Sequence, residues 1–381
     1  MTPTLFLLLR VLITALGVAA GSAVLWRRAR SRRAVGPLTV LWAGVWTVAG
    51  SALATILLGP LGISAFGMIH MVYLACVVGI PAVGVIVVAA RARRRMETTP
   101  AAWLVVAAGL LCARLGVYAS FVEPRDLRLE TAVVALRPER GGASPVRVGI
   151  LADLQCDDVG AFETRVVETL LAEQPDLILV PGDLFQPQLD RLAEWQRVRE
   201  PLMALLARVR APHGVYFVPG DVDAGDTLRA LREATDWVIL EDEVVQVRVR
   251  DRDLTIAGMR SRASHDVAAA LERREGTDDV RILMCHAPDI VLSLRGAPRA
   301  DLIVAGHTHG GQVVVPFFGP PITLSRVPRH VAAGGLHDVG GRALYVSRGA
   351  GLERNQAPPL RLLCPPEVSV LTLESRPAQR P

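Results

Sequence analysis

The sequence contains no lysine, few aromatic residues and no regular spacing of cysteines. All 42 basic residues are arginines, which we attribute to the base composition of the genome. Only 5% of the 381 residues are aromatic, so leucine, valine and alanine must produce the mean hydropathy of +0.35. The five cysteines follow no pattern and exclude a disulfide framework. An apolar content of 51% with a net charge of only +5 excludes disorder as the dominant state.

Acidic residues are almost absent from the first 120 positions, which hold eleven arginines and a single acid, Glu97. This part therefore carries a charge of +10, and residues 121–381 carry −5. Because the basic part is also the hydrophobic part, the charge distribution argues against a nucleic-acid-binding surface. It favours a membrane protein with a mildly acidic globular domain.

Four apolar stretches of 22 or 23 residues occupy this basic part. They are residues 5–26, 38–59, 68–90 and 101–122. Each is long enough to cross a hydrocarbon core of about 30 Å at about 1.5 Å per residue. The first stretch lacks the positive leader of a signal peptide. We therefore expect a transmembrane anchor of four helices over residues 1–122.

The connections between these stretches predict the orientation of the anchor. The first and third connections together carry nine arginines, whereas the second has no charge. The positive-inside rule places both arginine-rich connections in the cytoplasm, so both ends of the chain are expected outside the cytoplasmic membrane. Arg10 and Arg114 lie within the stretches. Intramembrane arginines can mark a polar pathway or a lipid headgroup site; alternatively, Arg10 snorkels to the near interface and Arg114 is paired or locally hydrated.

From residue 146 onward, short apolar runs alternate with amphipathic segments. The pattern predicts helices over 161–173 and 189–209, and strands over 146–152, 176–180, 214–218, 244–249, 254–257, 280–285, 302–305, 313–315, 343–346 and 368–373. Early βαβ alternation followed by denser strands is typical of an α/β sandwich with a mixed sheet. We assign residues 123–374 to this domain and expect 375–381 to be a loose tail.

Chemistry-bearing side chains follow five of the predicted strands. They are Asp153, Asp183, Asp221, His286, and His307 with His309. In an open α/β sheet the carboxyl ends of the strands line the ligand crevice. Carboxylates and imidazoles together suit divalent first-row metals, and a shared carboxylate such as Asp183 can bridge two of them. A single Gly-Asp is more often a turn and a lone histidine a core residue, but the five elements in order predict a metal site.

Residues 146–374 resemble the calcineurin-like metallophosphoesterases. The motifs that follow the order of this family are Asp153-Leu154-Gln155, Gly182-Asp183, Gly220-Asp221, Cys285-His286 and Gly306-His307-Thr308-His309. Those that resemble its bacterial membrane-anchored branch are Gly310-Gly311-Gln312, Tyr345-Val346-Ser347-Arg348-Gly349 and Cys364-Pro365-Pro366-Glu367. The resemblance implies a four-layer αββα sandwich and two divalent metal ions, such as Mn, Fe or Zn. One ion would take Asp153, Gln155, Asp183 and His309, and the other Asp183, Asp221, His286 and His307.

Three positions depart from the family pattern, which usually has His at Gln155, Asn at Asp221 and His at Val222. A glutamine offers a carbonyl oxygen in place of an imidazole nitrogen, and an aspartate adds a negative charge. Valine cannot protonate a leaving group, and general acid catalysis contributes about 10²–10⁴-fold to a rate. Asp223 or Asp226 could replace this acid, or could cap the following helix.

The resemblance implies a membrane-anchored phosphoester or pyrophosphate hydrolase that acts by metal-bound hydroxide attack outside the cytoplasmic membrane, with activity reduced by Gln155 and Val222. Its expected partners are membrane lipids and a phosphoester or lipid-linked substrate, with no nucleic acid and no obligate protein partner. Arg348 could contact phosphate or form a salt bridge within the domain. Phe317 and Phe318 could shape a lipid-facing rim or lie in a buried loop. The alternative function is a catalytically weakened metal-binding sensory module, and a transporter is a weaker third.

Overall fold

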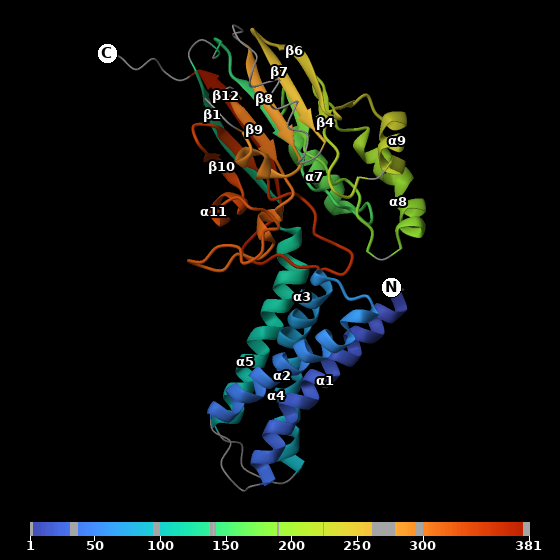
Figure 1. Ribbon diagram of the computed structural model, residues 1–381, viewed down its shortest axis with the longest axis vertical. Helices are drawn as coiled ribbons and strands as arrows, with labels where there is room; N and C mark the ends of the chain where they lie inside the picture. Colours follow the sequence, from blue (N-terminus) through green and yellow to red (C-terminus); the bar gives the residue numbers. More distant parts are fainter. Residues whose placement is uncertain are drawn as a thin grey trace, which may run out of the picture. The chain divides into compact units, whose positions relative to one another are not determined.

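The computed structural model describes residues 3–30, 37–93, 100–137, 140, 142–188, 190–223, 225–260, 279–294 and 300–375. The chain forms two compact units (Figure 1). The first comprises Met1–Val122, Gln188–Asp190 and Arg354–Pro359, and the second Glu123–Pro187, Arg191–Glu353 and Leu360–Pro381. All but the first residue of the predicted loose tail, and most of the two arginine-rich connections, lie outside the described residues.

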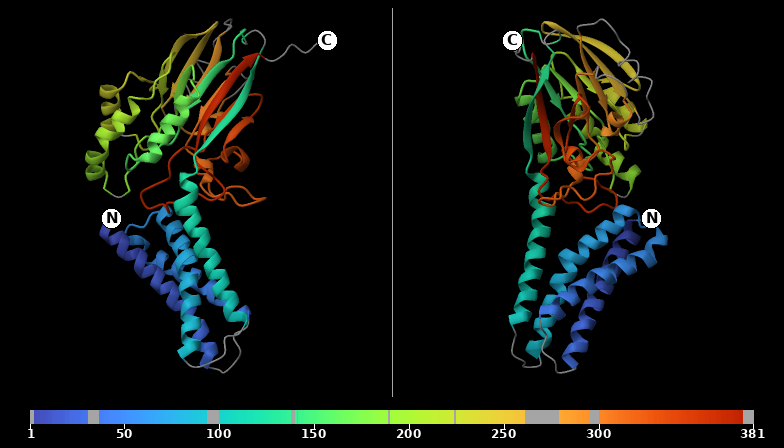
Figure 2. Two further views of the ribbon diagram at one scale, coloured as in Figure 1. Left: turned by 180° about the vertical axis from the view of Figure 1, so that it is seen from behind. Right: turned by 60° about the vertical axis from the view of Figure 1, so that its left-hand side comes forward.

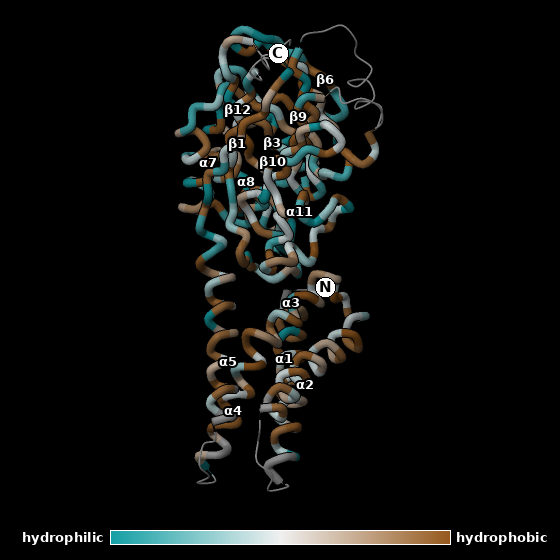
Figure 3. Tube along the Cα trace, turned by 90° about the vertical axis from the view of Figure 1, so that its left-hand side faces the viewer, coloured by the Kyte–Doolittle hydropathy of each residue, from teal (hydrophilic) through white to brown (hydrophobic). Residues whose placement is uncertain are grey.

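The first unit is helical. Its elements are α1 (Pro3–Arg30), α2 (Pro37–Leu58), η1 (Gly59–Leu61), α3 (Ala65–Leu74), the π-helical η2 (Ala75–Gly79), α4 (Ile80–Arg93), α5 (Pro100–Val117) and the π-helical η3 (Tyr118–Val122). Because α3, η2 and α4 run on continuously, the described residues contain four helices long and apolar enough to cross a membrane. Hydrophobic residues predominate along them (Figure 3). These four helices coincide with the four predicted apolar stretches.

Small residues allow α1 and α2 to approach each other closely. A Cβ atom at Gly17 would overlap the Ser51 hydroxyl, and one at Gly21 would overlap the Thr47 hydroxyl. The Thr47 hydroxyl donates to the Ala43 carbonyl within α2, at 2.8 Å. This is the small-residue packing that joins helices where no hydrophobic driving force is available.

The segment Arg354–Pro359 is bound within the first unit through Gln356. The Gln356 side chain accepts from the backbone N–H of Ser64 at 2.8 Å and donates to the Gly62 carbonyl at 2.9 Å. Its backbone carbonyl lies 3.0 Å from Nδ1 of the buried His70. These bonds attach the segment to the start of α3.

The second unit is built around two six-stranded sheets (Figures 1 and 2). The first sheet has the order β1 (Arg128–Leu136), β12 (Glu367–Ser375), β2 (Val146–Ile150), β3 (Leu177–Val180), β4 (Val215–Phe217), β5 (Val238–Ile239). The second has the order β10 (Gly335–Asp338), β11 (Ala343–Val346), β9 (Leu302–Ala305), β8 (Val280–Cys285), β7 (Arg252–Met259), β6 (Glu243–Val249). Strands β2 to β5 are mutually parallel, as are β11, β9, β8 and β7.

Apolar side chains from both sheets form one core between them, including Val148 and Leu179 from the first and Ile282 and Val304 from the second. The outer face of the first sheet is covered by α7 (Ala161–Ala172), α8 (Arg191–Leu206) and α9 (Gly225–Ala234). Among the described residues, the short helices η5 (Pro288–Leu292) and α11 (Arg329–Ala332) cover the outer face of the second sheet. The predicted α/β sandwich with helices outside two sheets is confirmed.

Several parts of the sequence-based assignment differ from the structure. Residues 313–315, predicted as a strand, form only single bridges, Val313 with Leu362 and Val315 with Gly319. The neighbouring Pro316, Pro320 and Pro321 lack the N–H groups that a ladder needs. Strands β1, β5 and β10 and helices α9 and α11 were not predicted. Strand β1 pairs with β12, which lies almost at the opposite end of the domain sequence.

Candidate metal centre

The predicted ligands lie where the parallel strands of both sheets end. Asp153 follows β2 and Asp183 follows β3, while His286 comes directly after β8. Asp221 follows β4, and His307 follows β9. Because these strands are parallel within each sheet, their carboxyl ends meet at one edge of the sandwich. The acids and imidazoles that follow these strands in the sequence therefore gather in a single cluster.

The backbone of this cluster has an unusual conformation. Five of the seven predicted ligands have positive φ angles: Asp153 (46°), Gln155 (35°), Asp183 (61°), His307 (72°) and His309 (49°). Residues other than glycine seldom adopt this region, and such strain concentrates at functional sites. Tight turns directly after the strands thus aim the side chains into the space between the two sheets' ends.

Asp153 and Asp183 are the buried acids of the centre. The Asp153 carboxylate accepts the backbone N–H of His307, with both oxygens at 3.0 Å, and burial raises its pKa to about 7. Asp183 accepts the Val222 N–H at 3.0 Å and lies 3.3 Å from His286 Nε2. Burial opposes ionisation of Asp183, but His286 and these hydrogen bonds outweigh it and lower its pKa. Two carboxylates enclosed together create a strong demand for positive charge.

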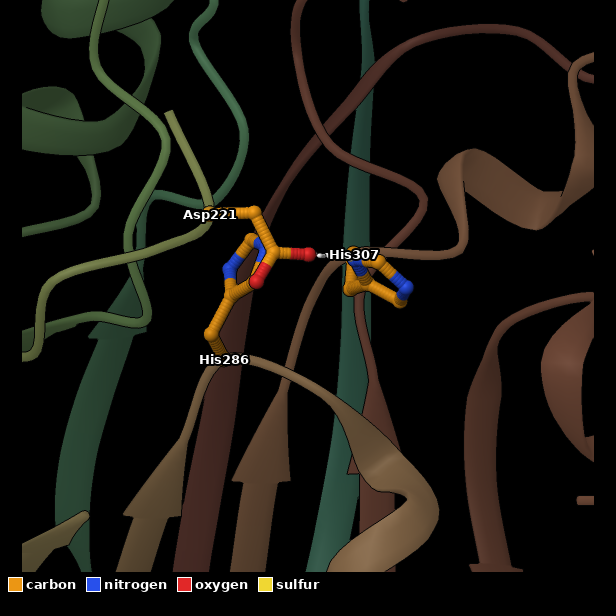
Figure 4. A group of neighbouring side chains, drawn as sticks. All are labelled: Asp221, His286 and His307. Carbon is orange, nitrogen blue, oxygen red and sulfur yellow. Dashed lines mark hydrogen bonds and ion pairs between the residues drawn. The ribbon is translucent and has the colours of Figure 1, made fainter. Parts of the chain in front are cut away.

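Hydrogen bonds orient the imidazoles of His286 and His307, which lie beside the Asp221 carboxylate (Figure 4). Nδ1 of His286 lies 2.8 Å from the Pro181 carbonyl, so this nitrogen carries the proton and Nε2 faces Asp183. His307 is held in the opposite sense, with Nε2 at 3.3 Å from the Leu324 carbonyl. Its Nδ1 therefore faces His286 Nε2 at 3.3 Å and the Asp221 carboxylate at 3.1 Å. Backbone carbonyls orient metal-binding histidines in this way.

His309 provides the strongest test of whether a metal fits. Both of its ring nitrogens are buried and have no hydrogen-bond partner among the described residues. Burial lowers the pKa of His309 well below its usual value, so the imidazole is neutral. Asp183 and His286 are near enough to influence this pKa. A buried neutral imidazole without a partner is costly unless it binds a cation, and a neutral imidazole is the form that does so.

Gln155 has a second neighbour that the sequence pattern did not reveal. Its Nε2 donates to Asp183 at 3.1 Å, and its side chain is also hydrogen-bonded to Glu353. Glu353 in turn accepts from Gln186 Nε2 at 2.7 Å, and its backbone N–H donates to Gln312 Oε1 at 2.6 Å. Burial raises the pKa of Glu353. This network joins Gln155 to Glu353, a residue distant in the sequence, so no local motif could have indicated it.

Among the described residues of the segment 221–226, no side chain takes the role of the family's histidine. The Asp221 carboxylate is 63% exposed and its hydrogen bond to His307 lowers its pKa. Asp223 accepts the backbone N–H groups of Asp183 at 2.7 Å, Gly220 at 2.9 Å and Leu184 at 3.0 Å. Asp223 therefore joins two loops, a role that differs from both predicted alternatives. Asp226 lies in the first turn of α9 and forms an ion pair with Arg191 at 2.8 Å.

Two arginines, Arg348 and Arg361, hold the loops that pack against the metal centre. Arg348 forms ion pairs with Glu130 and Glu367, which is the salt-bridge alternative considered for it. Arg361 was not singled out from the sequence, yet it is fully buried and donates to four backbone carbonyls at 2.6–3.1 Å. These carbonyls include those of Gly349 and Gly351. A Cβ atom at Gly349, where φ is +70°, would lie 2.6 Å from the Asp153 Cβ, so this loop packs directly behind Asp153.

The described residues fit a pair of divalent metal ions. Two groups place their ligand atoms within 4.8 Å of one another, namely Asp153 with Asp183 and His286, and Asp221 with His286 and His307. Gln155 contacts Asp183 directly, and His309 supplies the unpartnered nitrogens. The structure thus brings together all seven residues predicted as ligands, although their roles stay predictions.

Comparison with known proteins agrees with this geometry. Residues 146–311, which contain all seven predicted ligands, match the family described as Calcineurin-like phosphoesterase. The chain is 29% identical over 286 residues to the uncharacterized metallophosphoesterase YkuE of Bacillus subtilis, covering 71% of this chain and 94% of that protein. It is 28% identical over 241 residues to the phosphodiesterase YaeI of Escherichia coli, covering 61% of this chain and 84% of that protein. An uncharacterized metallophosphoesterase of Helicobacter pylori is 26% identical over 223 residues, covering 56% of this chain and 55% of that protein. The comparisons therefore show that the two-sheet unit is similar to the calcineurin-like phosphoesterases over residues 146–311.

Proposed function

We propose that this protein is a membrane-anchored, metal-dependent phosphoesterase whose phosphoesterase domain lies outside the cytoplasmic membrane. The observation that carries the proposal is the convergence of three aspartates and three histidines at one edge of the sandwich, with His309 lacking any partner for its buried nitrogens among the described residues. The similarity to this family supports metal-dependent phosphoester hydrolysis.

The protein's own residues hold and orient the reacting groups. Asp183 contacts both Gln155 and His286, so it lies between the two ligand sets. Bound divalent cations would supply Lewis acidity toward the phosphoryl oxygens and toward the attacking water. The carbonyls of Pro181 and Leu324 hold the imidazoles of His286 and His307 in fixed orientations. A rigid, preorganised ligand set needs no rearrangement when the substrate binds.

The substrate class follows from what surrounds Val222. Asp221 is ionised because its pKa is lowered, and the Asp223 carboxylate is directed toward three backbone N–H groups. Neither is placed to protonate a departing alkoxide. We therefore infer that the substrates are phosphodiesters or pyrophosphates whose leaving groups are stable without protonation. The name of the Escherichia coli relative, a phosphodiesterase, is consistent with this class.

The location rests on the helices and on the arginines that flank them. Four described helices can span a membrane. Nine arginines in the first and third connections favour a cytoplasmic position for both connections and so support a phosphoesterase domain outside the membrane. A phosphatase reporter fused to the C-terminus is expected to be active only outside the cytoplasm. Activity of a cytoplasmic reporter at this end would contradict the topology.

Metal analysis of the full chain, together with hydrolysis assays on a monoester, a diester and a pyrophosphate, tests the catalytic proposal. We expect close to two bound ions per chain and turnover of the diester or the pyrophosphate. If two ions bind while every substrate is inert, the weakened sensory module becomes the better description, as the loss of histidine at Val222 would suggest.

A further inference from the structure

An apolar loop, residues 313–324, borders the candidate metal centre. Five of its large hydrophobic side chains are exposed: Val315 (42%), Phe317 (112%), Phe318 (54%), Ile322 (43%) and Leu324 (50%). The other exposed hydrophobic residues described in the second unit, such as Leu192 and Val133, are scattered along the chain. Single exposed hydrophobic residues are ordinary, but a concentration of this kind marks an interaction surface. The prediction of a buried loop for Phe317 and Phe318 is therefore wrong.

The loop is built to present these side chains. The Gly319 N–H donates to the Val315 carbonyl at 2.9 Å, and the Val315 N–H donates back to the Gly319 carbonyl at 3.1 Å. Phe317 lies at the tip with a φ of +66°, a conformation that bulky residues rarely adopt. The proline at position 316 and the pair at 320 and 321 further restrict the backbone. A closed, strained turn with an aromatic tip is a fixed feature of the fold.

The base of the loop is connected to the metal centre. The Leu324 carbonyl lies 3.3 Å from Nε2 of His307. The next two residues are held by Asp289, which accepts from the Ser325 hydroxyl at 2.6 Å and from the Arg326 N–H at 2.9 Å. The base of the loop therefore lies beside the predicted ligand His307. A molecule bound to the centre and a molecule in contact with the loop can be one and the same.

The charge around the loop indicates which surface it contacts. No acidic residue occurs between positions 311 and 337, although residues 121–381 carry a net charge of −5. Arg326 and Arg329 lie in this interval, and the Arg329 guanidinium stacks over the Phe318 ring at 4.2 Å from its centre. Exposed aromatic side chains beside arginines are the composition of elements that enter the headgroup region of an anionic bilayer.

We propose that the 313–324 loop enters the lipid interface and that the metal centre acts on phosphoesters that carry a hydrocarbon chain within that bilayer. This inference rests on the proposed hydrolytic function and adds the substrate class to it. The occupant is the lipid surface, because four candidate membrane spans on the same chain keep a bilayer close to the domain. In this arrangement the loop contacts the hydrocarbon chains of the bilayer around the substrate, and the metal centre binds the substrate's phosphate.

Two esters with the same leaving group test the proposal. Ethyl 4-nitrophenyl phosphate is soluble, whereas hexadecyl 4-nitrophenyl phosphate partitions into the bilayer. The full chain is reconstituted in nanodiscs that contain phosphatidylglycerol and is compared with the variant Phe317→Ser/Phe318→Ser. For the hexadecyl ester we expect kcat/KM to fall by about 10-fold or more, mainly through KM, because two apolar contacts are lost. For the ethyl ester we expect a change of less than about twofold.

Leu192→Ser is the matched control, since this leucine is 69% exposed on α8 and lies outside the loop. It should leave both esters unaffected. An equal loss on both esters in the loop variant would show that the loop supports the centre structurally, and no loss on either would show that it has no role with lipid. Both results would overturn the proposal. Turnover of the ethyl ester alone by the wild type would also overturn it, while leaving the proposed hydrolysis intact.

A second measurement does not depend on turnover. Lipids with a diazirine in the acyl chain are photolysed in nanodiscs that contain the full chain, and the crosslinked peptides are identified by mass spectrometry. Crosslinks at residues 313–324 that disappear in Phe317→Ser/Phe318→Ser support insertion, even if neither ester is hydrolysed and the proposed function fails. Crosslinks confined to residues 1–122 would refute lipid contact.

Discussion

Arg361 offers a sharp test of how the metal centre is supported. Its guanidinium is fully buried and donates to the carbonyls of Arg348, Gly349, Gly351 and Cys364. The loop held in this way donates the Gly351 N–H to the Asp153 carbonyl at 2.7 Å. The substitution Arg361→Met keeps most of the side-chain length and removes every one of these donors.

The magnitude follows from the carbonyls left without a donor. A hydrogen bond from a charged donor contributes about 1.5–3 kcal/mol, so four carbonyls represent about 6–12 kcal/mol before any offset. Burial lowers the pKa of Arg361, which shows that the charge is held at a cost, and removing it recovers several kcal/mol. We therefore expect Arg361→Met to lower the free energy of unfolding of the domain by about 3–5 kcal/mol, a large share of the usual 5–15 kcal/mol.

Hydrogen exchange in the full chain measures this loss within the second unit alone. The slowest amides of β2 and β12 report global opening of the first sheet, so their free energies of exchange give the stability of the domain. Arg361→Lys retains the charge with fewer donors and should fall between the wild type and Arg361→Met. Arg208→Met is the control, because Arg208 forms an exposed ion pair with Glu168 at 2.9 Å, which contributes about 0–1 kcal/mol.

If Arg361→Met stayed within about 1 kcal/mol of the wild type, the size of an ordinary substitution, the buried guanidinium would not stabilise the domain in this way. A loss of stability accompanied by unchanged metal binding in the folded fraction would refute the second part of the argument, in which the loop positions Asp153. Mass spectrometry of the intact, metal-loaded chain separates these two results.

Three further predictions concern the ligands and the missing acid. Asp183→Asn should lower the number of bound metal ions more than Gln155→Ala does, because Asp183 contacts residues of both ligand sets. Inductively coupled plasma mass spectrometry measures the bound ions, and equal losses in the two variants would contradict the shared role of Asp183. Val222→His should raise turnover of alkyl esters by up to about 10²-fold over that of aryl esters, and an unchanged dependence on leaving-group pKa would show that the imidazole does not reach the leaving oxygen. Asp223→Asn places an amide N–H against a backbone donor and should lower stability by about 1–3 kcal/mol without changing that dependence, whereas the opposite result would identify Asp223 as the acid.

The amino-acid sequence alone was sufficient to predict the sandwich fold and the four apolar helices. Both predictions depend on local patterns, namely apolar runs of strand length and apolar runs of membrane length, which are visible without knowing any distant contact. It was also sufficient to nominate Asp153, Asp183 and His286, since a polar residue directly after a buried parallel strand must lie at the edge of the sheet.

The tertiary structure alone decided which polar groups meet across long distances in the sequence. Glu353 reaches Gln155, and the Asp223 carboxylate is directed toward the backbone of the loop that holds Asp183. Neither contact leaves a signal in a local pattern, because each joins segments whose separation depends on how the strands are ordered in the sheets.

The tertiary structure also decided which apolar side chains are exposed. In the sequence, Phe317 and Phe318 are apolar residues among prolines and glycines. Such a segment can lie in the core or at the surface. Whether a neighbouring element covers them depends on the packing of the whole domain, and in this fold the turn between Val315 and Gly319 holds them outward. Local sequence therefore determined which polar side chains are available at the edge of the sandwich. Only the assembled sheets and loops determined which side chains are buried, hydrogen-bonded or exposed, because these properties depend on contacts between distant segments.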